Sequence, residues 1–493
     1  MLHVRSILNV LAALITLLGL TMLGAAAWSW YYGDADLDGI FMASGLTVAV
    51  GLPIWFFTRG RVQLSIKDGF AVVTLTWLSI ALFGAFLFLF TDAIPNMTDA
   101  FFESMSGVTT TGASIINMSY GVEGGPQGIE SLSHGVLFWR SFIQWIGGMG
   151  IIVFSIAILP LLGVGGVQLF KAEVPGPVPD KIKPRVRETA KILWLVYFGI
   201  SLAEMLLLYA GGMTIFDAMC HMFTTMATGG FSTKNASIGG FNSIYIEYVI
   251  IFFMFLAGVN FSLHWKGLRG DFKSYFRDGE FKFYLGLIFF FTVLLIISNL
   301  VRSNEGVLSH TMVRAALFQV VSILTTTGYG TADYELWGWF AQFLLLLMMF
   351  IGGSAGSTGG GMKIMRIMTI TKYSLSEAKR LLHPRAVIPV RVGRRLISDD
   401  VIRNTLSFFL FFVAAFVLTS ISLTALGIDL VTAIGATAAS IGNIGPGLGE
   451  VGPLDHYGHL PGLAKWLLSF CMLLGRLEVF TVIVLFSRAF WKR

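Results

Sequence analysis

The chain alternates between long apolar runs and short polar connections over almost its whole length. An apolar run of about 20 residues is long enough for a helix to cross a lipid bilayer. The pattern predicts ten such spans, at about residues 7–31, 39–58, 69–92, 134–162, 189–211, 244–265, 281–302, 336–371, 401–427 and 463–489. Because helices satisfy their own backbone hydrogen bonds in lipid, we expect an all-α membrane protein.

The first apolar run also has features of a signal peptide. Arg5 precedes it, and Ala25–Ala27 resembles a cleavage site. The apolar core of a signal peptide is only roughly 7–15 residues long, which is shorter than this run. We therefore expect an uncleaved membrane helix that forms, with the second span, an N-terminal pair over residues 1–64.

Composition and charge agree with this pattern. Hydrophobic residues make up 55% of the 493 positions and charged residues 13%, whereas a soluble chain carries about a quarter charged residues. With Arg5, five segments hold 28 of the 34 Lys and Arg residues: 59–67, 171–191, 266–282, 363–403 and 488–493. The positive-inside rule places these segments and both termini in the cytoplasm. Because the basic runs flank apolar spans, we expect contact with membrane lipid and no nucleic-acid partner.

The motifs of common enzyme classes are missing from the sequence. Gly356 to Lys363 resembles a phosphate-binding loop, but Met362 stands where that motif needs lysine. Neither a zinc-protease motif nor a dinucleotide fingerprint occurs, and Cys220 and Cys471 lack metal-site spacing. We therefore expect no enzyme activity and no organic cofactor in this chain.

Four segments between the spans share one pattern, in which a short apolar stretch ends in a turn of small, hydroxyl and glycine residues. The aligned turns are Thr110-Thr111-Gly112, Ala227-Thr228-Gly229, Thr326-Thr327-Gly328 and Ser440-Ile441-Gly442. About 12 helical residues reach roughly halfway through a bilayer. A single such turn would suit a helix-packing motif, but four in register favour non-helical backbone that lines a cavity.

Glycine in such turns lets successive carbonyl groups face one axis. Four turns around one axis would form a ring of carbonyl oxygens that replaces the hydration shell of a cation. The half-helices would point their negative dipole ends at this ring, while Asp99, Asp217 and Asp429 suit their positive outer ends. The repeat therefore predicts a cation pore.

From about residue 65 to the end, these motifs, with Gly328-Tyr-Gly and Gly442-Asn-Ile-Gly-Pro-Gly, resemble the TrkH/KtrB/HKT superfamily of potassium transporters. The resemblance implies four helix–pore helix–filter loop–helix repeats around a central pore. Their expected limits are 65–170, 171–277, 278–397 and 398–493, and the two extra N-terminal spans suit the TrkH branch.

The resemblance also implies the ion and the partners. The twelve turn residues would bind potassium, the transported ion, and glycine rather than serine at position 112 suggests potassium over sodium. The fourth turn departs from the Thr-Thr-Gly pattern, which weakens the assignment of its ligands. The family implies a homodimer in the bacterial inner membrane with a cytoplasmic TrkA-like nucleotide-binding ring.

A glycine-rich stretch interrupts the span after the third turn. Six glycines fall within ten residues, which cannot sustain a helix: Gly352, Gly353, Gly356, Gly359, Gly360 and Gly361. The stretch could be a flexible cytoplasmic linker, but apolar residues continue on both sides of it. The resemblance implies a gating loop that crosses the pore beneath the filter.

Arg476 lies in the middle of the last span. An intramembrane arginine is costly unless it meets water or a partner. A structural ion pair with Glu478 or Glu204 is one explanation, and the resemblance implies another, an electrostatic barrier in the pore beside the gating loop. A proton- or sodium-coupled cation symporter is the alternative function, but the spans show few of the carboxylates that such coupling usually needs.

Overall fold

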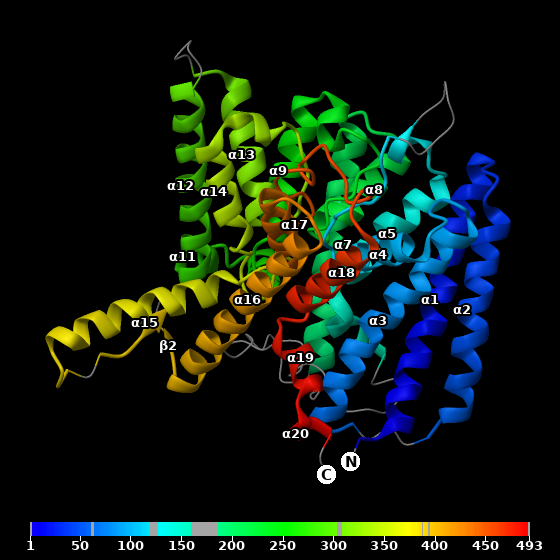
Figure 1. Ribbon diagram of the computed structural model, residues 1–493, viewed down its shortest axis with the longest axis horizontal. Coiled ribbons are helices and arrows are strands. Elements are labelled where there is room, and N and C mark those ends of the chain that lie inside the picture. Colours follow the sequence, from blue (N-terminus) through cyan, green and yellow to red (C-terminus); the bar gives the residue numbers. More distant parts are fainter. Residues whose placement is uncertain are drawn as a thin grey trace.

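The chain folds into a helical bundle with both ends of the chain at the same side (Figure 1). The computed structural model describes residues 2–60, 64–118, 127–158, 186–302, 308–386, 388–392 and 395–491. Most of the expected basic segment 171–191, including the expected boundary at 170/171, lies outside these residues, as does the end of the expected span 134–162.

The first two helices form an antiparallel pair along one side of the bundle (Figure 1). Helix α1 (Val4–Tyr32) packs along α2 (Leu37–Thr58), and α1 also contacts α3 (Ile66–Phe90). Gly19 lets α1 and α2 approach each other closely, and its carbonyl accepts a hydrogen bond from the Ser44 hydroxyl at 2.8 Å. Small residues at such contacts are typical of helix packing in membranes.

Six described helices are long and apolar enough to cross a membrane, or up to eight if two bent pairs each count as one span. Besides α1 to α3, the six include α7 (Val186–Ala210), α12 (Gly279–Arg302) and α16 (Asp399–Ala425). Only 22% of the residues in the most apolar stretch of α12 and of α16 are buried. Helices this apolar cannot face water over most of their surface, so the molecule is a multi-pass membrane protein.

The expected spans 244–265 and 463–489 are not single helices. Helix α9 (Ile244–Ala257) meets α10 (Phe261–Leu268) at 104°, because Asn260 caps a new helix there. Helix α18 (Gly462–Arg476) meets α19 (Phe480–Ile483) and η4 (Val484–Phe486) at 111°, after two residues with positive φ, Glu478 and Val479.

The expected spans 134–162 and 336–371, which also follow repeated turns, are interrupted too. Helix α5 (His134–Ile158) is kinked at Gly150, where φ is 66°. Helix α14 (Trp339–Met349) ends before the glycine-rich stretch, and α15 (Ile364–Leu382) begins after it. All four helices that follow the repeated turns are therefore broken, where the sequence indicated only one break.

Helix α15 extends from the bundle as an arm (Figure 1). A two-stranded antiparallel hairpin, β1 (Arg391–Val392) with β2 (Arg395–Leu396), accompanies it and is a small addition to the expected all-α fold. The remaining short elements are η1 (Gly128–Ser131), η2 (Ser237–Phe241), α11 (Lys273–Arg277), η3 (Tyr334–Trp337) and α20 (Arg488–Trp491).

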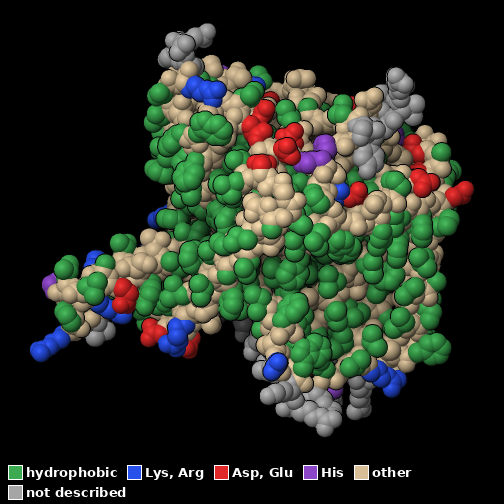
Figure 2. Space-filling view, in the orientation of Figure 1, with side chains coloured by type: hydrophobic (Ala, Val, Ile, Leu, Met, Phe, Trp, Pro, Cys, Tyr) green, Lys and Arg blue, Asp and Glu red, His purple; other side chains and the backbone are tan. Residues whose placement is uncertain are grey.

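Figure 2 shows a broad hydrophobic band across the middle of the molecule. Acidic and histidine side chains gather above the band, while Lys and Arg are concentrated below it and on the arm. A lipid bilayer would cover such a band and leave the charged rims in water.

Candidate functional site: a ring of four turns

Four short helices run from one rim into the bundle and stop there. They are α4 (Met97–Val108), α8 (Ile215–Met226), α13 (His310–Leu324) and α17 (Leu430–Gly442), and we call them the half-helices. The side chains of Asn96, Thr214, Ser309 and Asp429 cap their outer ends by accepting backbone N–H hydrogen bonds. Hydrogen bonding to Thr432 lowers the pKa of Asp429, so its charge suits the positive helix end.

Each half-helix ends in the same backbone motif. The residues just past the four ends, Thr110, Thr228, Thr326 and Asn443, have φ between 53° and 60°. In each turn the next residue donates a backbone hydrogen bond back to the half-helix. Thr111 N donates to Ser106 O at 2.8 Å, and Ile444 N donates to Ala439 O at 2.9 Å. This is the Schellman arrangement that normally uses glycine in the left-handed position.

A second positive-φ residue follows two positions later in all four units. These residues are Gly112, Gly230, Gly328 and Gly445, with φ of 81°, 74°, 84° and 101°. The backbone therefore aligns Gly230 and Gly445, rather than Gly229 and Gly442, with Gly112 and Gly328. The sequence alignment slipped by one residue in the second unit and by three in the fourth, because both turns contain more than one glycine.

The four turns close on one another as a ring. A Cβ atom at Gly112 would overlap Gly229 O, one at Gly230 would overlap Thr327 O, and one at Gly328 would overlap Ile444 O. A Cβ atom at Gly445 would lie 2.8 Å from Thr111 O, which returns to the first unit. Each unit thus presents to its neighbour the carbonyl that lies between its two positive-φ residues. We call Thr111, Gly229, Thr327 and Ile444 the ring residues.

The ring lies between two cavities. The outer cavity measures about 310 Å³, and Gly112, Gly230, Gly328 and Gly445 all border it. A second cavity of about 140 Å³ lies on the other side, bordered by Gly359, Gly360 and Arg476. The four turns therefore separate two spaces at the level where the half-helices end.

The glycine-rich stretch packs directly against the inner side of the ring. The N–H of Gly360 donates to the Thr326 hydroxyl at 2.6 Å, and a Cβ atom at Gly359 would lie 3.0 Å from Thr325 O. Gly352 N–H donates to Met362 O at 2.9 Å, so the stretch folds back on itself. Five of its six glycines border packed backbone and are buried, whereas Gly356 is exposed with φ of 78°. The stretch is thus an ordered loop rather than a flexible linker.

Two neighbouring elements anchor this loop. Glu280, at the start of α12, accepts hydrogen bonds from Ala355 N at 2.7 Å and Met365 N at 3.1 Å. At the break between α9 and α10, Gly258 O accepts from Ser354 N at 2.9 Å. A side chain at Gly258 would itself meet Tyr284 and Thr325. The breaks in separate units therefore support one another beneath the ring.

Arg476 joins the loop to α5. Its guanidinium donates to Thr358 O at 2.7 Å, to Gly148 O at 2.9 Å and to Gly147 O. Glu478, one of the two carboxylates considered as its partner, forms an ion pair with Arg366 of α15. Arg476 thus borders the inner cavity and binds carbonyl groups of two elements that face it.

Sequence reasoning missed several residues that the structure brings to this site. Gly230, Asn443, Ile444 and Gly445 belong to the ring by their backbone, and asparagine, which tolerates a left-handed conformation, was the signal at position 443. Glu280 carried no sequence signal because its partners are backbone amides. Among the described residues, no group of three or more His, Cys, Asp or Glu could hold a metal ion.

Known proteins resemble this chain along its whole length. A family model for TrkH, described as a cation transport protein, matches residues 39–493. The Trk system potassium uptake protein TrkH of Halomonas elongata is 42% identical over 499 residues and 99% of both chains. That of Escherichia coli K12 is 41% identical over 99% of this chain and 100% of its own. The crystal structure of the potassium transporter TrkH from Vibrio parahaemolyticus matches with a TM-score of 0.87 at 38% identity over 100% of both chains.

Proposed function

The chain belongs to the TrkH family of cation transport proteins, and on that premise we propose that it takes up potassium through the ring of four turns. The observation that supports this proposal is the closed ring of four turns, which brings four backbone carbonyl groups together at the contacts between units and lies between two cavities. Carbonyl oxygens in such a ring can replace the hydration shell of an ion. The negative ends of four half-helices add to the attraction for a cation.

In this proposal the units 65–170, 171–277, 278–397 and 398–493 each supply one half-helix and one turn of a selectivity filter. The filter ligands are the ring residues and their left-handed neighbours. Of the twelve residues expected from the sequence, Ala227, Ser440, Ile441 and Gly442 then lie at half-helix ends, one or more residues before the ring. The chain acts as a transporter, with potassium as cargo and no organic cofactor.

We further propose that the glycine-rich loop and Arg476 form the gate. The loop covers the inner side of the ring, and the Arg476 charge faces the inner cavity. A cation leaving the ring must pass this charge, so displacement of the loop with Arg476 would open the path. A cytoplasmic TrkA-like nucleotide-binding ring, bound to the basic rim and the arm, would control that displacement.

The same proposal places the protein in a bacterial inner membrane as a homodimer, with both termini in the cytoplasm. Support comes from the apolar band, from the Lys and Arg concentrated on one rim, and from the two bacterial relatives described above, which are Trk system proteins. The basic rim would also contact anionic lipid headgroups.

A proton- or sodium-coupled symporter is the second candidate, and one residue favours it. Glu204 of α7 is fully buried beside Thr225, and its carboxylate makes no hydrogen bond of ordinary geometry with the described residues. Buried carboxyl groups in spans often carry protons in coupled transporters.

Reconstitution into liposomes tests both candidates. We expect the protein to dissipate a potassium gradient with no pH gradient and no sodium present. Flux that appears only when a proton or sodium gradient is added would favour the symporter. Absence of potassium flux under every gradient would contradict both.

A further inference from the structure

In three of the four units, the segment that leaves the turn is tied to its own half-helix at one repeated position. Seven residues before the left-handed residue, the half-helices carry Glu103, His221, Gln319 and Ala436. Glu103 accepts from Ser114 Oγ at 3.0 Å and from Ile115 N at 2.9 Å, and His221 Nε2 lies 3.0 Å from Ser232 Oγ. Gln319 Nε2 donates to Ala332 O at 3.3 Å. Three units thus use a buried polar side chain for the same tether.

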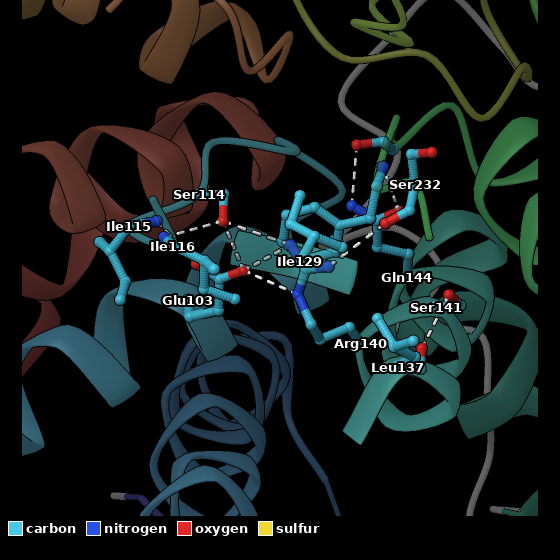
Figure 3. Close-up of polar contacts among 12 residues, drawn as sticks. Glu103, Ser114, Ile115, Ile116, Ile129, Leu137, Arg140, Ser141, Gln144 and Ser232 are labelled. Carbon is cyan, nitrogen blue, oxygen red and sulfur yellow. Dashed lines mark hydrogen bonds and ion pairs between the residues drawn. The ribbon is translucent and has the colours of Figure 1, made fainter. Parts of the chain in front are cut away.

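The tether in the first unit is also ionic, because Glu103 and Arg140 lie side by side with opposite charges (Figure 3). Glu103 pairs with Arg140 of α5, with Nε 2.9 Å and Nη2 2.8 Å from the same carboxylate oxygen. Their side chains are 0% and 1% exposed. A buried ion pair loses much of its Coulomb attraction to desolvation, so its value lies in fixing geometry more than in adding stability.

Arg140 also reaches the second unit. Its Nη2 donates to Ser114 Oγ at 3.2 Å, its Nη1 donates to Ser232 O at 3.5 Å, and its guanidinium lies 4.1 Å from the centre of the Phe231 ring. One helical turn farther along α5, Gln144 Nε2 donates to the ring carbonyl Gly229 O at 2.8 Å. Helix α5 therefore forms hydrogen bonds with the segments that follow the first two turns and with one ring carbonyl, Gly229 O.

We propose that the Glu103–Arg140 pair is a specificity-determining positioning unit, which sets the spacing between the first and second turns of the ring. The pair does not touch the ion. It acts through Ser114, Ile115 and Ser232, which follow Gly112 and Gly230 by two or three residues. This inference rests on the proposed function, because spacing matters for discrimination only if the ring binds a cation. Arg140 borders the outer cavity, where Glu103 neutralises its charge.

Two variants and a matched control test the pair in liposomes, by the ratio of potassium to sodium flux. Glu103→Gln keeps the shape but removes the charge, and Glu103→Gln with Arg140→Gln removes both charges. The control is Glu247→Gln, which removes the negative charge from a partly buried pair elsewhere, Glu247 with Arg314 at 2.7 Å, between α9 and α13.

We expect the Glu103→Gln ratio to fall about tenfold, the factor that one charge-assisted hydrogen bond is typically worth. Total flux should fall as well, because Arg140 is then an uncompensated positive charge at the outer cavity. The double variant should recover total flux but not the ratio, and Glu247→Gln should change neither.

A wild-type ratio in either folded variant would overturn the inference, and so would failure of both variants to fold, which would make the pair a scaffold contact. Loss of flux with an unchanged ratio would also overturn it. If the wild-type protein itself carried no potassium, the proposed function would fail instead.

Discussion

Single residues at the ring hold unusual backbone conformations. Thr110, Thr228 and Thr326 are β-branched residues at positive φ, a region that such side chains normally avoid. Each such residue costs about 1–3 kcal/mol, and such strain persists only where the surrounding structure enforces it. Two features restrain these turns. One is the set of backbone hydrogen bonds at the end of each half-helix, and the other is the close packing of the turn of the next unit. Strain repeated at equivalent positions in three units indicates a shared constraint on the turns and supports the proposed role of the ring.

The glycines of the ring give the most direct test at this scale. Gly112→Ser must place a side chain at φ of 81° against Gly229 O, so the first two turns must separate. We expect potassium-over-sodium discrimination in liposome flux to fall about tenfold or more, because strain of this kind costs about 1–3 kcal/mol.

Gly427→Ala is the control for this substitution. Gly427 also has positive φ, at 88°, but a Cβ atom there would meet nothing within 4 Å. We expect this variant to lose about 1 kcal/mol of stability and to keep its discrimination. If Gly112→Ser kept the wild-type discrimination between potassium and sodium, Gly112 would not be a filter residue.

Arg476→Ala separates a barrier in the pore from a structural partner. If the proposed ion path runs through the inner cavity, removal of the positive charge that borders this cavity should raise flux about tenfold or more, since such a charge contributes over about 1 kcal/mol even at an effective dielectric constant of about 20. Purified protein would be assayed for flux and thermal stability together. Loss of stability without a gain in flux would contradict the barrier.

At this scale the sequence indicated the residue types but not their exact places. Thr-Thr-Gly showed where the first and third turns lie, since each contains one glycine that fits. In the second and fourth turns, Gly229-Gly230 and Gly442-Asn-Ile-Gly445 offered several glycines, and only the backbone dihedral angles choose between them. Glu103 and Arg140 could not be paired from the sequence, because 37 positions and a change of helix separate them.

Among the elements, the break in each helix after a turn is the shared feature. Hydropathy predicted the six unbroken spans well, since their apolar runs and the helices α1, α2, α3, α7, α12 and α16 agree within a few residues. It could not predict the bends, because an apolar run has the same hydropathy whether its helix is straight or broken. Near two of the bends, Gly258 and Gly475 pack closely against another backbone or side chain, which a single sequence does not reveal.

The glycine-rich loop is the break whose loss should change function most. Deletion of Gly356 to Gly360 removes the segment that donates to Thr326 and accepts from Arg476. We expect basal flux to rise several-fold and to depend less on a cytoplasmic partner. A folded deletion with unchanged basal flux would exclude a gating role.

A milder change acts through the anchor of the loop. Glu280→Ala removes the acceptor of Ala355 N and Met365 N, so we expect a smaller rise in basal flux than the deletion gives. Glu280→Gln keeps a carbonyl oxygen as acceptor and should behave nearly as wild type in the same assay. Equal flux from the two variants would mean that the anchor does not restrain the loop.

For the whole molecule, the apolar band and the uneven charge of the two rims define an orientation. The rim with the chain ends and the arm carries most of the Lys and Arg, which the positive-inside rule assigns to the cytoplasm. The half-helices start from the opposite rim, so under this assignment they would enter from outside and point their negative ends inward. The outer cavity would then receive external potassium, and the loop would stand between the ring and the cell interior.

Cysteine labelling checks this orientation, because the two native cysteines, Cys220 and Cys471, are both buried and should not react. Met118, near the outer cavity, is 59% exposed, and Leu381, near the end of the arm, is 83% exposed. We expect a membrane-impermeant thiol reagent to label Met118→Cys in intact cells but Leu381→Cys only after permeabilisation. Both variants should keep wild-type potassium flux, since neither side chain touches the ring or the loop. The reverse labelling pattern would mean that the protein is inserted in the opposite orientation. The loop could then not act as a gate on the cytoplasmic side.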